Sequence, residues 1–368
     1  MTHETDAPGA TPGRDHRELT DERVSPMTDT VMAASARLPA TETIAGLHLA
    51  PADADYARLA ERMATIANAC NQLEGVDELP TADELRNWLL ASGDHFDAAK
   101  DVQLALVDDR LVGYTWVDWV DTTDGLREYR LGGYVHPDWQ RRGIGTLLLE
   151  WGEQHARDHA AAHATDRPLA VGSWASEKRQ RKAALLAKHS YEPVRWFFEM
   201  LRPDLESIDV PPLPKGLEVR QVTNADAELR QLFAADVEAF QDHWGGFASD
   251  EAAYQEWIND PHFDPSLYVV AFDGDEIAGG VENAVYREEN AAFNRSRGWL
   301  DSVFTRRPWR RRGLGAALVA RSLVRLREAG MTEAMLGVDS DNPTGALGLY
   351  ERAGFKVHAR SSAFRKPM

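Results

Sequence analysis

One short pattern occurs twice in this chain, each time between a predicted strand and a predicted helix. The later occurrence reads WLDSVFTRRPWRRRGLG over residues 299–315. Residues 300–305 are predicted as a strand, and apolar residues recur at helical spacing after Gly313. The first N–H groups of a helix have no intrahelical partner, and the helix dipole adds positive potential there. The pattern therefore predicts an anion site, which we interpret as a cradle for a pyrophosphate.

The earlier occurrence reads RLGGYVHPDWQRRGIGTLLL over residues 130–149. Its QRRGIG segment has the same glycine spacing as RRRGLG, and a helical pattern follows again. Repetition at a long period indicates a duplicated domain. We therefore predict four segments: a disordered tail at 1–42, a first copy at 43–203, a Pro-rich linker at 204–215 and a second copy at 216–368.

Each copy alternates segments typical of strands and helices, which favours an α/β fold. Apolar alternation over 103–119 predicts a hairpin that turns at 108–110, and residues 268–286 predict another that turns at Asp273-Gly274. Residues 226–240 are predicted as a helix. The strands expected to close the sheet of the first copy lie at 168–174 and 191–201.

The R/Q-x-x-G-x-G turn between strand and helix resembles motif A of the GNAT acyltransferase superfamily, which binds the pyrophosphate of coenzyme A. In the second copy DNPTGALGLYERAGF follows at the distance that this family shows. The resemblance covers nearly everything after residue 44 and is to the tandem-domain type. It implies an α/β (α+β) fold with two GNAT-like domains, each a mixed, mostly antiparallel, splayed sheet flanked by helices. It also implies N-acyl transfer from acyl-CoA, with acetyl-CoA as the expected co-substrate.

The resemblance assigns cofactor binding to the turn, to the end of the strand before it and to one later asparagine. In the second copy these residues are Val303, Phe304, Thr305, Arg310, Arg311, Arg312, Gly313, Leu314, Gly315, Ala316 and Asn342. In the first copy they are Val135, Gln140, Arg141, Arg142, Gly143, Ile144, Gly145 and Thr146. The resemblance also implies that a backbone N–H of the strand 303–305 polarises the thioester carbonyl. This assignment depends on the position of the segment and not on its residue types.

Tyr350 is the clearest catalytic side chain, because the resemblance places a tyrosine near the thioester sulfur as a general acid. A phenol with an ordinary pKa near 10 is protonated at neutral pH and can donate. The alternative is that Tyr350 only packs its helix against the sheet. We expect Asn342 to cap that helix, with Pro343 at the first helical position and Gly354 just past the end.

The base that deprotonates the amine is less clear. Asp301 ranks first among side chains, because it stands two residues before the carbonyl-binding strand segment. Glu282 and His243 are alternatives, and so is deprotonation through solvent. Gly337 occupies a place where some members of the family carry a carboxylate, so that candidate is missing here.

The first copy lacks the acid. If HSY at 189–191 matches AGF at 353–355, Tyr350 aligns with Leu186 and Asn342 with Lys178. Leucine cannot donate a proton. We therefore predict that the first copy keeps a cofactor turn but is catalytically degenerate.

Composition restricts the partners. The chain has 41 basic and 59 acidic residues, a formal charge of −18, so we expect no nucleic-acid partner in spite of the RRPWRRRG run. The single cysteine, Cys70, fits a reducing cytoplasm, and there is no apolar run of 18 residues to cross a membrane. A metal site is not expected either: His155, His159 and His163 have helical spacing but no completing ligand.

The acceptor is therefore expected to be a small-molecule or protein amine, in the cytoplasm, with the oligomeric state open. The alternative, from a different class of function, is a non-enzymatic sensor that binds acyl-CoA or a partner-binding module. The presence of Tyr350 favours the enzyme.

Overall fold

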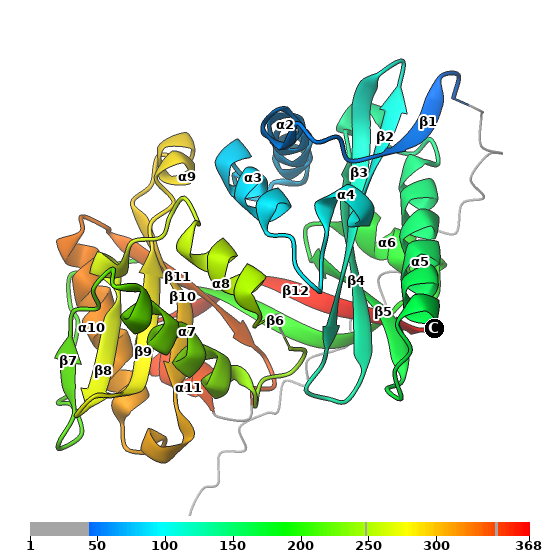
Figure 1. Cartoon of the computed structure of the whole chain (residues 1–368). Helices are drawn as coiled ribbons and strands as arrows, with labels where there is room; N and C mark the ends of the chain where they lie inside the picture. Colours follow the sequence, from blue (N-terminus) through cyan, green and yellow to red (C-terminus); the bar gives the residue numbers. More distant parts are fainter. Residues whose placement is uncertain (1–43, 247–248, 343–344) are drawn as a thin grey trace, which may run out of the picture. The chain divides into compact units, whose positions relative to one another are not determined.

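All strands of the described chain join one mixed sheet in the computed structural model, which describes residues 44–246, 249–342 and 345–368. The order along the sheet is β1-β2-β3-β4-β5-β12-β6-β11-β10-β9-β8-β7 (Figure 1). The pairs β4–β5 and β10–β11 are parallel, and the other described pairs are antiparallel. The predicted class is confirmed: a mixed, mostly antiparallel sheet flanked by helices, with two copies of one arrangement.

The first copy supplies half of the strands. They are β1 (Leu47–Pro51), β2 (Val102–Val107), β3 (Arg110–Asp121), β4 (Arg127–Val135), β5 (Leu169–Ser176) and β6 (Glu192–Arg202). Its helices are α2 (Tyr56–Glu74), α3 (Ala82–Leu90), α4 (Ala98–Asp101), α5 (Ile144–Ala162) and α6 (Gln180–Lys188), with a 3-10 turn η1 (Pro137–Trp139). The hairpin β2–β3 turns at Asp108 and Asp109 as predicted.

The second copy repeats this series. Its strands are β7 (Glu218–Arg220), β8 (Val269–Asp273), β9 (Glu276–Ala284), β10 (Arg297–Thr305), β11 (Glu333–Asp339) and β12 (Lys356–Pro367). Its helices are α7 (Asp226–Phe240), α8 (Glu251–Ile258), α9 (Arg287–Ala292), α10 (Leu314–Glu328) and α11 (Ala346–Arg352), with η2 (Pro265–Leu267) and η3 (Arg307–Trp309). Helix α7 has the predicted bounds.

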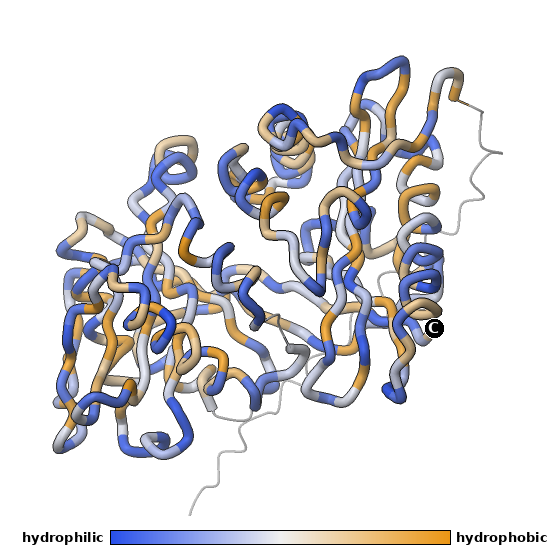
Figure 2. Tube along the Cα trace, in the orientation of Figure 1, coloured by the Kyte–Doolittle hydropathy of each residue, from blue (hydrophilic) through white to orange (hydrophobic). Residues whose placement is uncertain are grey.

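Each copy has a hydrophobic core on both faces of its part of the sheet. In the second copy α10 covers one face through Leu318 and Leu323, and α7 covers the other through Leu232. In the first copy α5 and α2 take these places. Along α5 and α2, hydrophobic and hydrophilic residues alternate (Figure 2), as expected when one side of a helix packs on a sheet.

The last strand of each copy pairs with the fifth strand of the other copy. β6 pairs with β11, and β12 pairs with β5. The two exchanged strands also pair with each other over most of their length. The prediction that residues 191–201 close the sheet of the first copy is therefore wrong. Alternating apolar residues show that a segment is a strand, but they do not show which strand lies beside it.

Ion pairs reinforce this exchange. Arg365 on β12 donates to the carboxylates of Asp124 and Glu128, both from the first copy, and the Arg365 and Glu128 side chains are buried. Between β6 and β7, residues 203–217 form neither helix nor strand, in agreement with a linker. The domain limits themselves stay a prediction. The predicted tail, residues 1–42, lies outside the described residues, and no helix of the described part is long and apolar enough to cross a bilayer.

Candidate active site

The two predicted turns have the same backbone conformation. Gly143 has φ 89° and Gly313 has φ 85°, values in the left-handed region that glycine adopts without steric cost. Two residues earlier, Arg141 and Arg311 are also left-handed, with φ 64° and 59°. Two segments so far apart in sequence share an unusual geometry, and this agrees with a duplicated functional turn.

The first residue of each turn is held against the strand before it. Arg310 Nε donates to the Thr305 carbonyl at 2.8 Å, and Gln140 Nε2 donates to the Val135 carbonyl at 3.0 Å. The side chains differ, but the bond and the spacing of five residues are the same. This bond fixes the angle at which the chain enters the helix.

Each turn leads into the N-terminus of a long helix whose first backbone N–H groups are unpaired within the described residues. The first intrahelical bonds run from the Ala317 N–H to the Gly313 carbonyl and from the Leu147 N–H to the Gly143 carbonyl. The three N–H groups before each of them have no hydrogen-bond partner among the described residues, and no side chain caps either helix. A Cβ at Gly313 would meet nothing within 4 Å. The space and the donors therefore suit a phosphate.

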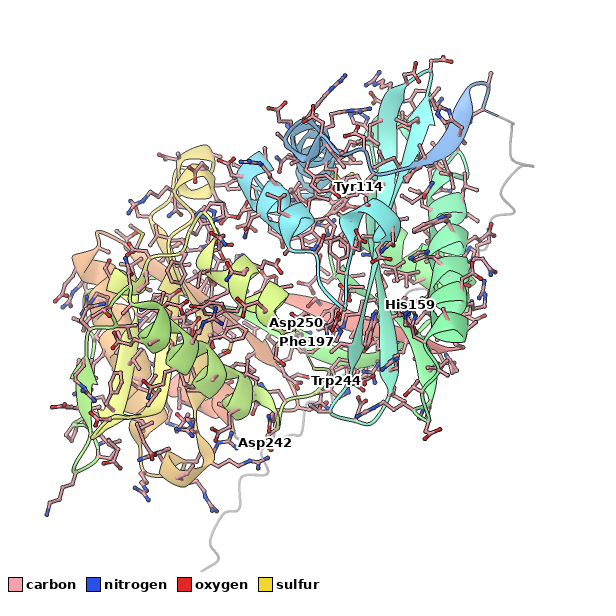
Figure 3. The ribbon with its side chains drawn as sticks, viewed as in Figure 1. Tyr114, His159, Phe197, Asp242, Trp244 and Asp250 are labelled. Atoms are coloured by element: carbon pink, nitrogen blue, oxygen red, sulfur yellow. The ribbon has the colours of Figure 1, made fainter. Side chains whose placement is uncertain are left out.

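The arginines of the second turn have different roles. Arg311 and Arg312 are exposed and make no hydrogen bond or ion pair with the part of the chain that the structure describes. Arg310 instead bonds to Asp242, labelled in Figure 3, and to the Ala239 carbonyl at the end of α7. Hydrogen bonds from Arg307 and Arg310 hold the pKa of Asp242 well below its usual range. Arg310 is committed to shaping the turn, which leaves Arg311 and Arg312 as charges for a ligand.

The strand before each turn separates from its parallel neighbour. β10 pairs with β11 only from Arg297 to Leu300, and β4 pairs with β5 only from Arg127 to Arg130. Beyond these points that edge of each strand has no ladder partner in the described sheet. Residues 301–305 therefore have one edge without a ladder partner, although the Thr305 carbonyl on it accepts from Arg310 Nε. This is the splay that the resemblance predicted.

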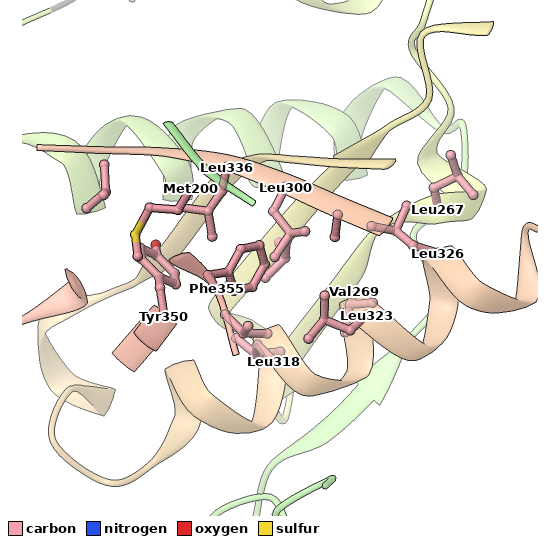
Figure 4. Packing of buried hydrophobic residues seen from close by; sticks show 14 of the residues in the cluster. Met200, Leu267, Val269, Leu300, Leu318, Leu323, Leu326, Leu336, Tyr350 and Phe355 are labelled. Atoms are coloured by element: carbon pink, nitrogen blue, oxygen red, sulfur yellow. The ribbon is translucent and has the colours of Figure 1, made fainter. Parts of the chain in front are cut away.

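Tyr350 lies on α11 beside this splay. Its side chain is buried with Met200, Leu336 and Phe355 (Figure 4), and its ring is 6.1 Å from that of Phe355. Burial raises the pKa of Tyr350, so the phenol stays protonated throughout the physiological range. The structure thus accommodates both predicted roles, since the ring packs in the core and the hydroxyl keeps its proton.

The structure supports the predicted alignment of Tyr350 with Leu186. The Phe355 N–H donates to the Tyr350 carbonyl at 3.0 Å, and the Tyr191 N–H donates to the Leu186 carbonyl at 3.0 Å. One residue before each of these donors, the chain is left-handed. Leu186 is buried as Tyr350 is. The first copy therefore has a hydrocarbon side chain where the second has a phenol.

The expected capping role of Asn342 is wrong. Helix α11 begins at Ala346, and its N-cap is Gly345, a left-handed residue without a side-chain cap. The Asn342 N–H donates to the Asp339 carbonyl, and the Asn342 carbonyl accepts from the Gly345 N–H. Because α11 begins four residues after Asn342, an Asn-Pro start does not apply. Pro343 lies outside the described residues.

Asp301 stands at a β-bulge of β10. The register with β9 shifts between Leu300 and Ser302, so Asp301 is the extra residue. Its side chain is exposed and accepts a hydrogen bond from the Tyr286 hydroxyl at 2.9 Å. The surrounding protein removes enough water to raise the pKa of Asp301 to about 6, against the opposing effect of the Tyr286 bond. A carboxyl with this pKa is mostly ionised at neutral pH and can take up a proton.

Two further carboxyl groups lie under the bulge. Glu282 on β9 is buried and accepts from Trp257 Nε1 at 3.0 Å, while its Oε1 has no partner. Asp236 on α7 accepts from the Ser302 hydroxyl. Burial raises the pKa of both groups, and each carboxylate opposes ionisation of the other. A buried pair that resists ionisation is better suited to holding a proton in the core than to acting as the base.

The remaining candidates are also placed by the structure. Burial lowers the pKa of His243, which keeps this imidazole neutral, and its ring packs 4.3 Å from that of Phe240. Sequence reasoning missed Asp236 and Tyr286, which contact β10 from other elements. The apolar pattern around them gave no signal for either contact.

The histidines of α5 and the single cysteine have ordinary hydrogen-bond partners. His155 Nε2 lies 2.7 Å from Asp101 Oδ1, and His159 Nδ1 lies 3.1 Å from the Tyr129 hydroxyl. No group of three or more metal-ligating side chains occurs in the described ranges. Cys70 is buried, its thiol donates to the Val135 carbonyl, and burial raises its pKa to about 11.

Two splayed strand pairs, each followed by a glycine turn and a helix N-terminus, define a tandem acyltransferase, and one copy retains a buried tyrosine. Comparison with known proteins agrees. The profile described as the Acetyltransferase (GNAT) family matches residues 60–170 and 229–355. The chain belongs to this family and is an N-acetyltransferase.

Relatives with assigned names cover most of the chain. A mycothiol acetyltransferase of Geodermatophilus obscurus is 31% identical over 306 residues, which is 82% of this chain and 92% of the relative. A protein of the same name from Salinispora arenicola is 29% identical over 295 residues, 79% of this chain and 88% of the relative. Both matches extend through the two copies.

Solved structures show the same fold. A GCN5-related N-acetyltransferase from Sphaerobacter thermophilus has a TM-score of 0.62 and 26% identity, covering 87% of this chain and 95% of that one. A tandem GNAT protein from the clavulanic acid biosynthesis pathway has a TM-score of 0.63 and 18% identity, covering 87% and 98%. The second likeness concerns the fold alone.

Proposed function

We propose that this protein transfers an acetyl group from acetyl-CoA directly to a primary amine, and that the second copy performs the reaction. One observation carries the choice of copy. Both copies keep the turn, but the position that holds Tyr350 in the second holds Leu186 in the first. Donation of a proton to a departing thiolate needs an acidic hydrogen, which only the second copy has at this place.

Acetyl-CoA would be held by the turn of the second copy. Its pyrophosphate fits the free N–H groups of Leu314, Gly315 and Ala316 and the charges of Arg311 and Arg312. Its pantetheine arm would lie along residues 303–305, as an added strand lies along a free sheet edge. An N–H of this segment would then donate to the thioester carbonyl. Asn342, on the loop before α11, is a further proposed contact.

The chemistry then needs two proton transfers. Asp301 takes a proton from the ammonium of the acceptor, and the neutral nitrogen attacks the carbonyl carbon. The C–N bond forms, the C–S bond breaks, and Tyr350 gives its proton to the thiolate. The second proton of the nitrogen leaves to solvent, from which Tyr350 is reprotonated. Direct transfer is favoured because the single thiol, Cys70, belongs to the first copy and is buried.

The first copy would bind acyl-CoA without turning it over. Residues 144–146 offer the same free N–H groups, and Arg141 and Arg142 are exposed as their counterparts are. Val135 and Gln140 set the geometry of the turn. Binding without chemistry is the expected consequence of Leu186.

The acceptor is proposed to be a small amine related to mycothiol, the compound in the names of the relatives. The matches cover 82% and 79% of the chain, so they extend into both copies. A cytoplasmic location is part of the proposal, because the reducing cytoplasm suits a free thiol.

Turnover of a panel of amines tests the function. Deacetylated mycothiol, D-glucosamine, L-cysteine and spermidine would be assayed with acetyl-CoA, and release of CoA and formation of the acetylated product would be measured. We expect deacetylated mycothiol or a related amine to be acetylated. Binding of acetyl-CoA without acetylation of any amine would overturn the proposal and favour the sensor.

Glycine variants test the cradle. Gly313→Val places a branched side chain at a left-handed residue that meets the ligand space, and we expect acetyl-CoA to lose at least 10-fold in affinity at the active copy. Gly143→Val should remove a second, non-productive binding site in calorimetry and leave turnover unchanged. Gly330→Val is the matched control, since Gly330 is also left-handed (φ 88°) and exposed but lies at the far end of α10. Equal effects of all three would reject the cradle.

A further inference from the structure

The second copy has Gly337 at a position where, by the family resemblance, some members carry a carboxylate. Gly337 directly follows Leu336, the last residue of β11 that pairs with β10. It therefore stands where the splay opens. A Cβ at this position would meet nothing within 4 Å, so the face above Gly337 is open.

The exchanged strand places Glu199 next to this opening. Glu199 on β6 is the register partner of Gly337 on β11. On these two strands the neighbouring residues Met200 and Leu336 point into the core under α10 (Figure 4). Because successive side chains alternate between faces, Glu199 and Gly337 share the opposite face. Asp301 lies at the bulge between the core residue Leu300 and Ser302, whose hydroxyl bonds to Asp236 on α7, so we infer that it faces away from α10 as well.

The neighbours of Glu199 leave it room to lean toward the splay. Its register partner on β11 is Gly337, and its register partner on β12 is Ala359. Adjacent strands lie about 4.8 Å apart, so Glu199 lies roughly one strand spacing from Gly337, and Asp301 lies across the opening, on the strand that has separated from β11. Two methylene groups let the Glu199 carboxylate reach over the glycine.

Glu199 is also without a partner. The side chain is half-buried, and it makes no hydrogen bond or ion pair within the described residues. Burial is the main cause that raises its pKa, followed by the charges of Glu78 and Asp77. The nearest cations are committed elsewhere: Lys178 donates to the Gly75 carbonyl, and Arg297 pairs with Glu333. A half-buried carboxylate with no partner is costly unless a ligand provides one.

We propose that Glu199 binds the ammonium group of the acceptor above Gly337, opposite Asp301. The first copy thereby supplies, through its exchanged strand, the carboxylate that the second copy does not have. Glu199 holds the acceptor by an ion pair, and Asp301 takes the proton. This inference rests on the proposed acetyl transfer and assigns the group that positions its acceptor.

Steady-state kinetics of Glu199→Gln test the assignment, with deacetylated mycothiol or, if it is not acetylated, the fastest amine of the panel. We expect the KM for the amine to rise about 10-fold to 100-fold, with kcat within about 3-fold and the affinity for acetyl-CoA unchanged. Glu192→Gln is the matched control, since Glu192 is an exposed glutamate on the same strand. An unchanged KM for the amine in Glu199→Gln would overturn the inference.

A rescue experiment separates binding from a structural role. In the Glu199→Gln background, Gly337→Asp restores a carboxylate on the same face from the neighbouring strand. We expect this second substitution to reverse at least half of the increase in the KM for the amine, measured on a logarithmic scale. No recovery by this substitution would count against the inference.

A second pair of variants keeps the test open if Glu199→Gln does not fold. Gly337→Lys puts a cation beside Glu199 and should raise the KM for the amine at least 5-fold more than the uncharged Gly337→Met. Equal effects of these two would again overturn the inference. If the wild-type protein acetylates no amine, the proposed function fails; if it does and the Glu199 variants behave as wild type, only this inference fails.

Discussion

The two copies share the turn that we propose to hold a cofactor and differ at the side chain that we propose to act on it. The turns at Gly143 and Gly313 superpose in backbone angles and in the bond from their first residue to the preceding strand. The difference lies at Leu186 and Tyr350, which occupy one place in two helices. The two copies can thus share the geometry of the turn and differ at the proposed acid, since the backbone forms the turn and a single side chain would supply the acid.

The copies are nevertheless not independent. β6 of the first copy lies between β11 and β12 of the second, and β12 pairs in turn with β5. The second copy therefore depends on the first for one of its central strands. Variants of four features test how far the copies depend on each other and differ: the shared strand, the proposed acid, the proposed base and the turn that follows α11.

The largest effect is expected when the copies are separated. A chain that begins at Gly216 lacks β6, so β11 and β12 lose the strand that pairs with both of them. We expect complete loss of transfer and a tendency to aggregate through the open strand edges. Activity and sedimentation would be measured against a chain that begins at Thr43, which should retain full activity. A soluble and active second copy would show that the exchange is dispensable.

Removal of the proposed general acid is expected to have the next largest effect. Tyr350→Phe keeps the ring that packs against Phe355 but removes the hydroxyl, and we expect kcat to fall about 10-fold to 1000-fold with little change in the affinity for acetyl-CoA. Adding Leu186→Tyr to this variant should not restore activity, because the first copy lacks counterparts of Asp301 and Glu199 in the proposed roles. Full activity of Tyr350→Phe would leave Tyr350 with a packing role only.

Much of this comparison was accessible from the sequence. Glycine spacing predicted both turns, since left-handed residues and helix N-termini depend on local chemistry. Residues 226–240 were correctly predicted as a helix, and the hairpins turn where Asp-Gly and Asp-Asp dipeptides stand. The alignment of Tyr350 with Leu186 followed from matching HSY at 189–191 with AGF at 353–355.

The remainder depends on contacts between segments far apart in sequence. The pairing of β6 with β11 has no local signal, so Glu199 could not be associated with the site. The bulge at Asp301 is visible only against the register of β9. The predicted start of α11 was too early, because an Asn-Pro pair predicts a helix start even where the helix begins a few residues later.

The pH dependence of kcat/KM tests whether Asp301 is the base. Asp301 has a pKa raised to about 6, and it must be ionised to accept a proton. We therefore expect kcat/KM to fall about 10-fold per pH unit below pH 6, and Asp301→Asn to lower kcat about 10-fold to 100-fold and to remove this acid limb. Asp275→Asn, in the exposed β8–β9 turn, is the control. A wild-type pH profile in Asp301→Asn would favour deprotonation through solvent.

The smallest effect concerns the residue after the acid helix. Ser190 and Gly354 occupy equivalent left-handed positions, with φ 66° and 88°, but only one of them is a glycine. Ser190→Gly relieves a backbone conformation that costs a non-glycine residue about 1 kcal/mol, and the extra entropy of the unfolded chain offsets about half of this. We expect a gain in stability of about 0.5 kcal/mol, a rise in Tm of ~1 °C, and unchanged kinetics. Gly354→Ala should have the opposite sign, so thermal unfolding of the two variants tests whether the copies still share this turn after only one of them has kept the tyrosine.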